Sequence, residues 1–165
     1  MIVKNKSPPP LGGGDLYWNS MMNHDIIRTV RLKCLDLNVV LKETNRLYTR
    51  RLGEQIVEKF NNDEYFRDTL FCVLVDSYSF LDIYPYDPKM VGKITNIILD
   101  ETTNSLIAEL TIINTISGCI VDKTIDLCPY RLCPVGFADE KNIDDIEIIT
   151  SESNYNLIGF TINKE

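Results

Sequence analysis

The sequence contains side chains that could act as nucleophiles in hydrolysis, but few that could activate them. Cys133 is a candidate thiol nucleophile, and Ser117 is an alternative hydroxyl nucleophile. Either chemistry needs a nucleophile, a base within hydrogen-bond reach and donors that stabilise the oxyanion. The only histidine is His24, which precedes the first expected strand and which we interpret as a surface or packing residue. Cys133 therefore has no neighbouring histidine in the sequence to activate it.

The metal-ligating residue types do not form a metal-binding pattern. The chain has five cysteines, Cys34, Cys72, Cys119, Cys128 and Cys133. No two of them have the CxxC spacing of a zinc site. The acidic residues Glu140, Asp144, Asp145 and Glu147 match no calcium-loop spacing and are interpreted as a solvated loop. We therefore expect no metal and no cofactor, and we expect reduced, partly buried thiols.

Composition limits the class of partner. The 165 residues are 44% hydrophobic, which is enough for one packed core. The net charge is −7 and the basic residues are dispersed, which argues against nucleic-acid binding because that mode needs a basic face. No apolar run approaches the ~18 residues of a membrane span. The first residues lack the apolar run of a secretion signal, so we expect a cytoplasmic origin and no membrane association.

Residues 1–25 are expected to form a flexible N-terminal arm, and residues 26–165 a single β-rich domain. Three prolines and three glycines within residues 8–14 combine a stiff element with a flexible hinge. Tyr17, Trp18 and Met21 then form an apolar cluster that contains the only tryptophan. This cluster either packs back onto its own domain or docks on a neighbouring subunit, since such residues are enriched at interfaces.

Alternating and β-branched runs predict most of the domain to be strands. The expected strands are residues 27–41, 70–75, 91–99, 106–113, 143–150 and 155–162. Those at 91–99 and 106–113 form a hairpin with a polar turn. Tyr78, Phe80, Tyr84 and Tyr86 lie in an aromatic loop that could pack on the core or form an interface.

Helical spacing predicts two helices. Thr49 is the expected N-cap of a helix over residues 49–61, because Leu52, Ile56 and Phe60 fall on one face. A second, short helix is expected over residues 118–127. Its predicted buried set is Ile120, Val121, Ile125 and Leu127. About six or seven strands with one or two helices define a β-rich α+β fold.

Five segments resemble, in order, the prohead proteases of tailed phages. They are Asn-Arg-Leu-Tyr at residues 45–48 before a helix, Ile-Tyr-Pro at 83–85, the hairpin ending in Ser117-Gly118, Leu-Cys-Pro-Val-Gly-Phe at 132–137, and the closing strand at 155–162. These proteases share a barrel-like core with the herpesvirus assembly proteases. The resemblance therefore implies a barrel-like antiparallel core for this chain.

The same resemblance implies that catalysis has been lost. It aligns Pro134 with the family's catalytic serine and Tyr84 with its histidine. Proline has no nucleophilic atom, and a tyrosine with a pKa near 10 is a poor base at neutral pH. Cys133 is expected to be a buried thiol facing away from Pro134, because neighbouring strand positions point to opposite faces. Tyr84, Cys133, Pro134 and Gly136 would then form a vestigial site.

These expectations favour a non-enzymatic virion structural protein. It would be an auxiliary or decoration protein made in the host cytoplasm and located on the capsid. Its partners would be the major capsid protein and other copies of itself, with no nucleic acid and no membrane. The candidate contact residues are Tyr17, Trp18, Met21, Tyr78, Phe80 and Tyr86.

Two alternatives stay open from the sequence. One is an active maturation protease that uses Cys133 or Ser117. The other is a cytoplasmic protein-interaction module unrelated to capsids, for which the family resemblance is accidental.

Overall fold

The computed structural model describes residues 26–42, 44–74, 89–139, 142–150 and 155–165. The larger sheet contains, in spatial order, β1 (Ile26–Asp36), β6 (Ser105–Ile113), β5 (Met90–Asp100), β4 (Phe71–Val73), β10 (Asn156–Lys164) and β7 (Tyr130–Phe137). The smaller sheet contains β2 (Val40–Leu41), β3 (Arg46–Tyr48), β9 (Ile146–Ile149) and β8 (Asn142–Ile143). The helices are α2 (Arg50–Asn62), α3 (Glu64–Thr69) and α4 (Ile116–Thr124).

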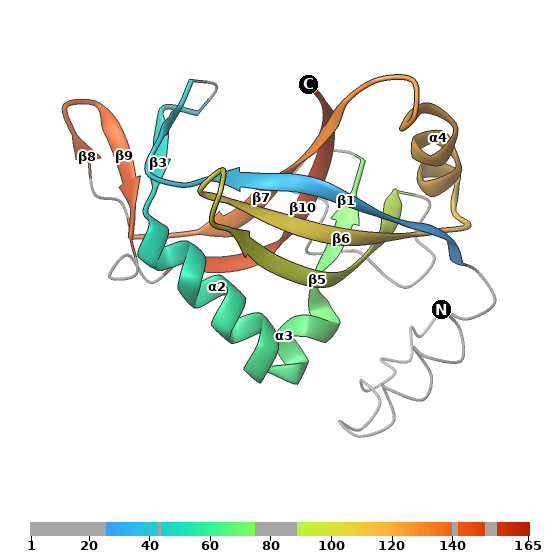
Figure 1. The fold of residues 1–165 in the computed structure, drawn as a ribbon, viewed down its shortest axis with the longest axis horizontal. Coiled ribbons are helices and arrows are strands. Elements are labelled where there is room, and N and C mark those ends of the chain that lie inside the picture. Colours follow the sequence, from blue (N-terminus) through green and yellow to red (C-terminus); the bar gives the residue numbers. More distant parts are fainter. Residues whose placement is uncertain (1–25, 43, 75–88, 140–141, 151–154) are drawn as a thin grey trace, which may run out of the picture.

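The larger sheet curls strongly, and its two terminal strands, β1 and β7, contact each other (Figure 1). The strand pairing shifts its register at one point on each of three strands, and these irregularities allow local bending. They lie between Lys33 and Leu35 on β1, between Ile94 and Asn96 on β5, and between Leu157 and Gly159 on β10. Most pairs are antiparallel, but β4 pairs in parallel with β10, and β3 pairs in parallel with β9. The predicted β-rich, barrel-like α+β fold is confirmed, with these two parallel pairs as a departure from the antiparallel expectation.

One hydrophobic cluster joins both sheets and α2. Fully buried side chains such as Ile94, Leu110 and Leu132 come from the larger sheet, while Ile149 comes from the smaller one. The predicted N-cap of α2 is confirmed, since the Thr49 hydroxyl accepts a hydrogen bond from the Leu52 N–H. From this N-cap onward, the apolar face of α2 packs on β5.

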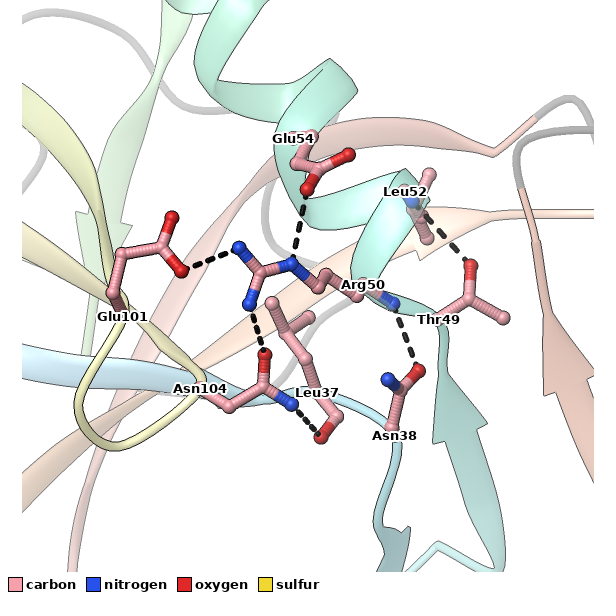
Figure 2. Close-up of polar contacts among 8 residues, drawn as sticks. All are labelled: Leu37, Asn38, Thr49, Arg50, Leu52, Glu54, Glu101 and Asn104. Atoms are coloured by element: carbon pink, nitrogen blue, oxygen red, sulfur yellow. Dashed lines mark hydrogen bonds and ion pairs between the residues drawn. The ribbon is translucent and has the colours of Figure 1, made fainter.

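Arg50, the first residue of α2, joins three segments that are far apart in the sequence (Figure 2). Its backbone N–H donates to Asn38 Oδ1 at 2.9 Å. Its guanidinium donates to Glu54 at 3.0 Å, to Glu101 at 2.5 Å and to Asn104 Oδ1 at 3.2 Å. The helix terminus is thus tied both to the turn after β1 and to the turn between β5 and β6.

Three sequence predictions about the bounds of strands and helices were wrong. The expected strand over residues 143–150 is split into β8 and β9, because Asp144 and Asp145 adopt left-handed conformations with φ of 50° and 63°. The expected strand over residues 27–41 is broken after Asp36, because Asn38 adopts a left-handed conformation with φ of 58°. Helix α4 begins at Ile116 instead of residue 118, because the Thr115 hydroxyl caps it by accepting from the Gly118 N–H. Helix α3 was not predicted at all; Asp63 both ends α2 and caps α3.

Of the four residues predicted to form the buried face of the α4 helix, two are exposed. Val121 is fully buried, and Ile125 packs against the core. Ile120 is 48% exposed and Leu127 is 80% exposed, so both point away from the sheet. The inner face is instead completed by Ser117 and Gly118.

The arm expected at residues 1–25 lies outside the described residues. None of the helices in the described ranges is long and apolar enough to cross a membrane.

Gly92→Ala is expected to destabilise the fold strongly. A Cβ at Gly92 would lie 2.0 Å from the Thr111 carbonyl oxygen, so β5 and β6 would have to separate. We expect a loss of about 3 kcal/mol in the free energy of unfolding, at the upper end for overpacking. Urea unfolding followed by circular dichroism measures this loss.

Gly53→Ala is the matched control for this prediction. Its Cβ would meet only the Leu37 side chain, at 2.6 Å, and alanine is favoured over glycine inside a helix by about 1 kcal/mol. A smaller loss is therefore expected. Equal losses for the two variants would contradict the backbone clash as the cause.

Candidate functional site

Strand β7 carries the residues that the sequence assigned to a vestigial site. Pro134 pairs with Phe160, Cys133 with Thr161 and Gly136 with Leu157 on β10. β7 is the terminal strand of the larger sheet, so one of its edges has no hydrogen-bonded neighbour among the described strands. A proline is tolerated at such an edge because its missing N–H is not needed there.

A pocket of about 520 Å³ lies at this place. Its lining from β7 and the end of β10 is Arg131, Cys133, Pro134, Asn163, Lys164 and Glu165. The hairpin of β2 and β3 contributes Leu41, Thr44, Arg46 and Tyr48. The structure therefore brings two of the four predicted site residues, Cys133 and Pro134, to one cavity.

Cys133 is half-buried, which differs from the expected buried thiol. The Asn163 side-chain amide donates to Cys133 Sγ at 3.3 Å from the neighbouring strand. Cys133 and Pro134 line the same pocket, so their alternation along β7 does not separate them into different cavities. Cys133 thus borders the pocket, and its thiol accepts one hydrogen bond.

Three basic side chains line the pocket in a protein whose net charge is −7. The Arg46 guanidinium pairs with Glu147 at 2.5 Å. The Arg131 guanidinium lies 3.7 Å from Asp36, and its buried Nε has no hydrogen-bond partner among the described residues. Glu147 was predicted to lie in a solvated acidic loop, but the structure places it in this ion pair on β9.

Gly136 has a packing reason to be glycine. A Cβ at this position would lie 2.8 Å from the Tyr155 hydroxyl oxygen and 2.6 Å from the Asn156 carbonyl oxygen. The Tyr155 ring in turn meets the Tyr48 ring edge-on, with centroids 5.8 Å apart. The phenol ring of Tyr155 thus fills the space that a side chain at position 136 would need.

The two tyrosines beside the pocket are neutral at physiological pH. Burial raises the pKa of Tyr155 well above its ordinary value of 10.0. Burial also raises the pKa of Tyr48, against the opposing effect of Arg46. Neither phenol can act as a base near pH 7, because the pKa of a general base needs to lie near the working pH.

The remaining predicted site residues fall outside the described residues. These are Tyr84, which the sequence resemblance aligns with the family's base, and the candidate contact residues Tyr17, Trp18, Met21, Tyr78, Phe80 and Tyr86. His24 falls outside as well. Within the described ranges, no three His, Cys, Asp or Glu side chains are grouped so that they could hold a metal ion.

Sequence reasoning assigned no role to several residues that line the pocket. Arg46 and Tyr48 belong to the Asn-Arg-Leu-Tyr segment, which was noted only for its resemblance. No sequence pattern pointed to Arg131 or Asn163, because their contacts arise only when β7 pairs with β10 and β1 lies next to β7.

A curled, nearly closed sheet that packs against a second small sheet and one long helix defines a fold of the capsid assembly protease type. The solved structure of the capsid assembly protease gp21 of bacteriophage T4 is similar to this chain, with a TM-score of 0.58 and 14% sequence identity. The similarity covers 81% of this chain and 80% of that chain. At this identity the similarity shows the fold alone. No protein-family model matches the sequence, and no curated protein matches it.

The free energy of unfolding is expected to fall as the pH rises above 9. Burial raises the pKa of Cys34 and of Cys72 above the ordinary value of 9.0, so these thiols keep their protons in the folded protein. In the unfolded chain they ionise, so that above pH 9 the unfolded state binds fewer protons and is favoured. The expected loss is about 1.4 kcal/mol per pH unit for each thiol.

Urea unfolding between pH 7 and pH 10 measures this slope. Cys34→Ala removes one of the two buried thiols and should reduce the slope, while Cys72 still contributes. An unchanged slope in the Cys34→Ala variant would show that the Cys34 thiol does not contribute.

Proposed function

We propose that this chain is a non-enzymatic structural protein of a tailed-phage head, an auxiliary or decoration protein that binds the major capsid protein. The observation that carries this proposal is the presence of Pro134 on β7, within a fold like that of a capsid assembly protease. The sequence resemblance aligns this position with a catalytic serine. A proline there cannot attack a peptide bond, so the fold is left with binding as its role.

The capsid setting rests on the fold and on the order of the sequence motifs. The similar solved structure is that of a protein named for capsid assembly. A chain with this fold and without the nucleophile could retain the affinity for capsid subunits while losing their cleavage. It would then be located on the virion after assembly in the host cytoplasm.

The contact residues expected from the sequence remain part of the proposal. The aromatic residues Tyr78, Phe80 and Tyr86 are candidate capsid contacts, as are Tyr17, Trp18 and Met21. Aromatic side chains and methionine supply much of the energy at protein interfaces. Contacts between copies of the chain are a second use of the same residues.

One observation favours an active protease as a second candidate. Cys133 lines a pocket together with Arg46, Arg131 and Lys164, and a cysteine thiol is a candidate nucleophile. The lining residues include no histidine, and the two neighbouring tyrosines stay protonated. The thiol therefore has cationic side chains nearby but no histidine among the lining residues to accept its proton.

Co-sedimentation with capsid shells tests the proposal. The shells are assembled from the major capsid protein encoded by the same genome, and unassembled capsid protein is used in parallel. We expect saturable binding to shells with no cleavage of the capsid protein. The Cys133→Ala variant should bind equally well, because the thiol has no catalytic role in this proposal.

Other outcomes separate the alternatives. Cleavage of the capsid protein that Cys133→Ala abolishes would establish the protease and refute the proposal. Cleavage that persists in Cys133→Ala but is lost in Ser117→Ala would assign the nucleophile to Ser117. Failure to bind either shells or subunits would favour an interaction module unrelated to capsids.

A further inference from the structure

Helix α4 presents an uncovered apolar surface. Ile116 is 68% exposed, Ile120 is 48% exposed and Leu127 is 80% exposed. Ile116 and Ile120 are four residues apart and therefore lie on one side of α4, and Leu127 lies in the turn that follows the helix. We call these three residues the α4 patch.

The α4 patch is not the inner face of the helix. Ser117, Gly118 and Val121 pack inward, where a Cβ at Gly118 would lie 2.0 Å from the Ile113 carbonyl oxygen. Helix α4 is therefore apolar both on its inner face and on its outer face. A helix with apolar residues on both faces is normally buried against protein on both. Leu127 lies in the turn after α4, where its backbone N–H donates to the Thr124 carbonyl at 2.9 Å and its side chain is exposed.

The first described residues of the chain lie beside this helix. Ile26 pairs with Ile113, three residues before α4 begins. The Arg28 guanidinium reaches α4 and the turn after it, pairing with Asp122 at 2.7 Å and with Asp126 at 2.9 Å. Figure 1 shows the start of β1 and α4 at the same end of the larger sheet. Ile26 and Ile27 are themselves 44% and 37% exposed, which extends the apolar surface toward residues 1–25.

The segment that precedes Ile26 has the length and the chemistry to cover the α4 patch. Residues 16–22 read Leu-Tyr-Trp-Asn-Ser-Met-Met and end four residues before Ile26. Four residues of extended chain span up to about 13 Å, and the nine residues of α4 are about 13 Å long. Trp, Tyr, Leu and Met side chains match an isoleucine and leucine surface, because burying both removes apolar area from water.

We propose that the α4 patch is the docking site for residues 16–22 of the same chain, with Trp18 as the buried anchor. The sequence left open whether this cluster packs on its own domain or on a neighbouring subunit. Because the α4 patch lies beside the point where residues 1–25 join β1, we favour packing of residues 16–22 on their own domain. This inference concerns the free protein; contact of Tyr17, Trp18 and Met21 with the capsid would require the segment to leave the α4 patch.

Tryptophan fluorescence tests the inference, because Trp18 is the only tryptophan. In the full-length wild type we expect emission shifted to the blue of the urea-unfolded protein and reduced quenching by acrylamide. Ile120→Asp and Leu127→Asp should each shift the emission to the red and raise the quenching toward the unfolded value. Val39→Asp, at a residue 55% exposed beyond the other end of β1, is the matched control and should leave both unchanged.

Three results would overturn the inference. Trp18 could be as accessible in the wild type as in the unfolded chain. Its protection could survive both α4 substitutions, which would place its docking site elsewhere. Protection that is lost on dilution, together with dissociation of a dimer in sedimentation, would assign the segment to a second copy of the chain. Far-ultraviolet circular dichroism and the urea midpoint verify that each variant is folded.

Discussion

The structure depends on the curl of its larger sheet. A six-stranded sheet stays open unless its strands bend, and here the breaks in register on β1, β5 and β10 allow the bending. Gly92 lets β5 and β6 approach closely within the same curved region. Because of the curl, β7 lies next to β1, and the β2 and β3 hairpin that continues from β1 reaches over β7 and β10. The pocket beside Cys133 exists only because these ends meet.

Much of the fold followed from local patterns in the sequence. The hairpin of β5 and β6 consists of two apolar, β-branched runs around a polar turn, and Thr49 caps α2 as expected, so each element carries its own signal. Strands β2, β3 and β8 are only two or three residues long, so they carry no periodic pattern that identifies them. Of the three, β3 also depends on pairing with a distant strand, β9. The exposure of Ile120 and Leu127 was missed because a helix that is apolar on two sides does not reveal which side faces the core.

The site was predictable only along β7. Its order of residues led to Cys133, Pro134 and Gly136, and the first two do line one pocket. The other wall comes from Arg46 and Tyr48, and Arg46 is held by Glu147, 101 residues away in the sequence. Such contacts depend on the tertiary arrangement of two sheets. The reason for Gly136 likewise became visible only from the position of the Tyr155 ring.

Pro134 also affects how the protein meets other copies of itself. The terminal strands of a sheet expose unpaired backbone groups, and strands of other molecules can add to them and start aggregation. In this fold β1 and β7 approach each other, which leaves less of either edge accessible. A proline in β7 removes one backbone donor that an added strand would require. Pro134, which the sequence resemblance aligns with a catalytic serine, is also a residue type that natural proteins place at sheet edges to limit strand addition.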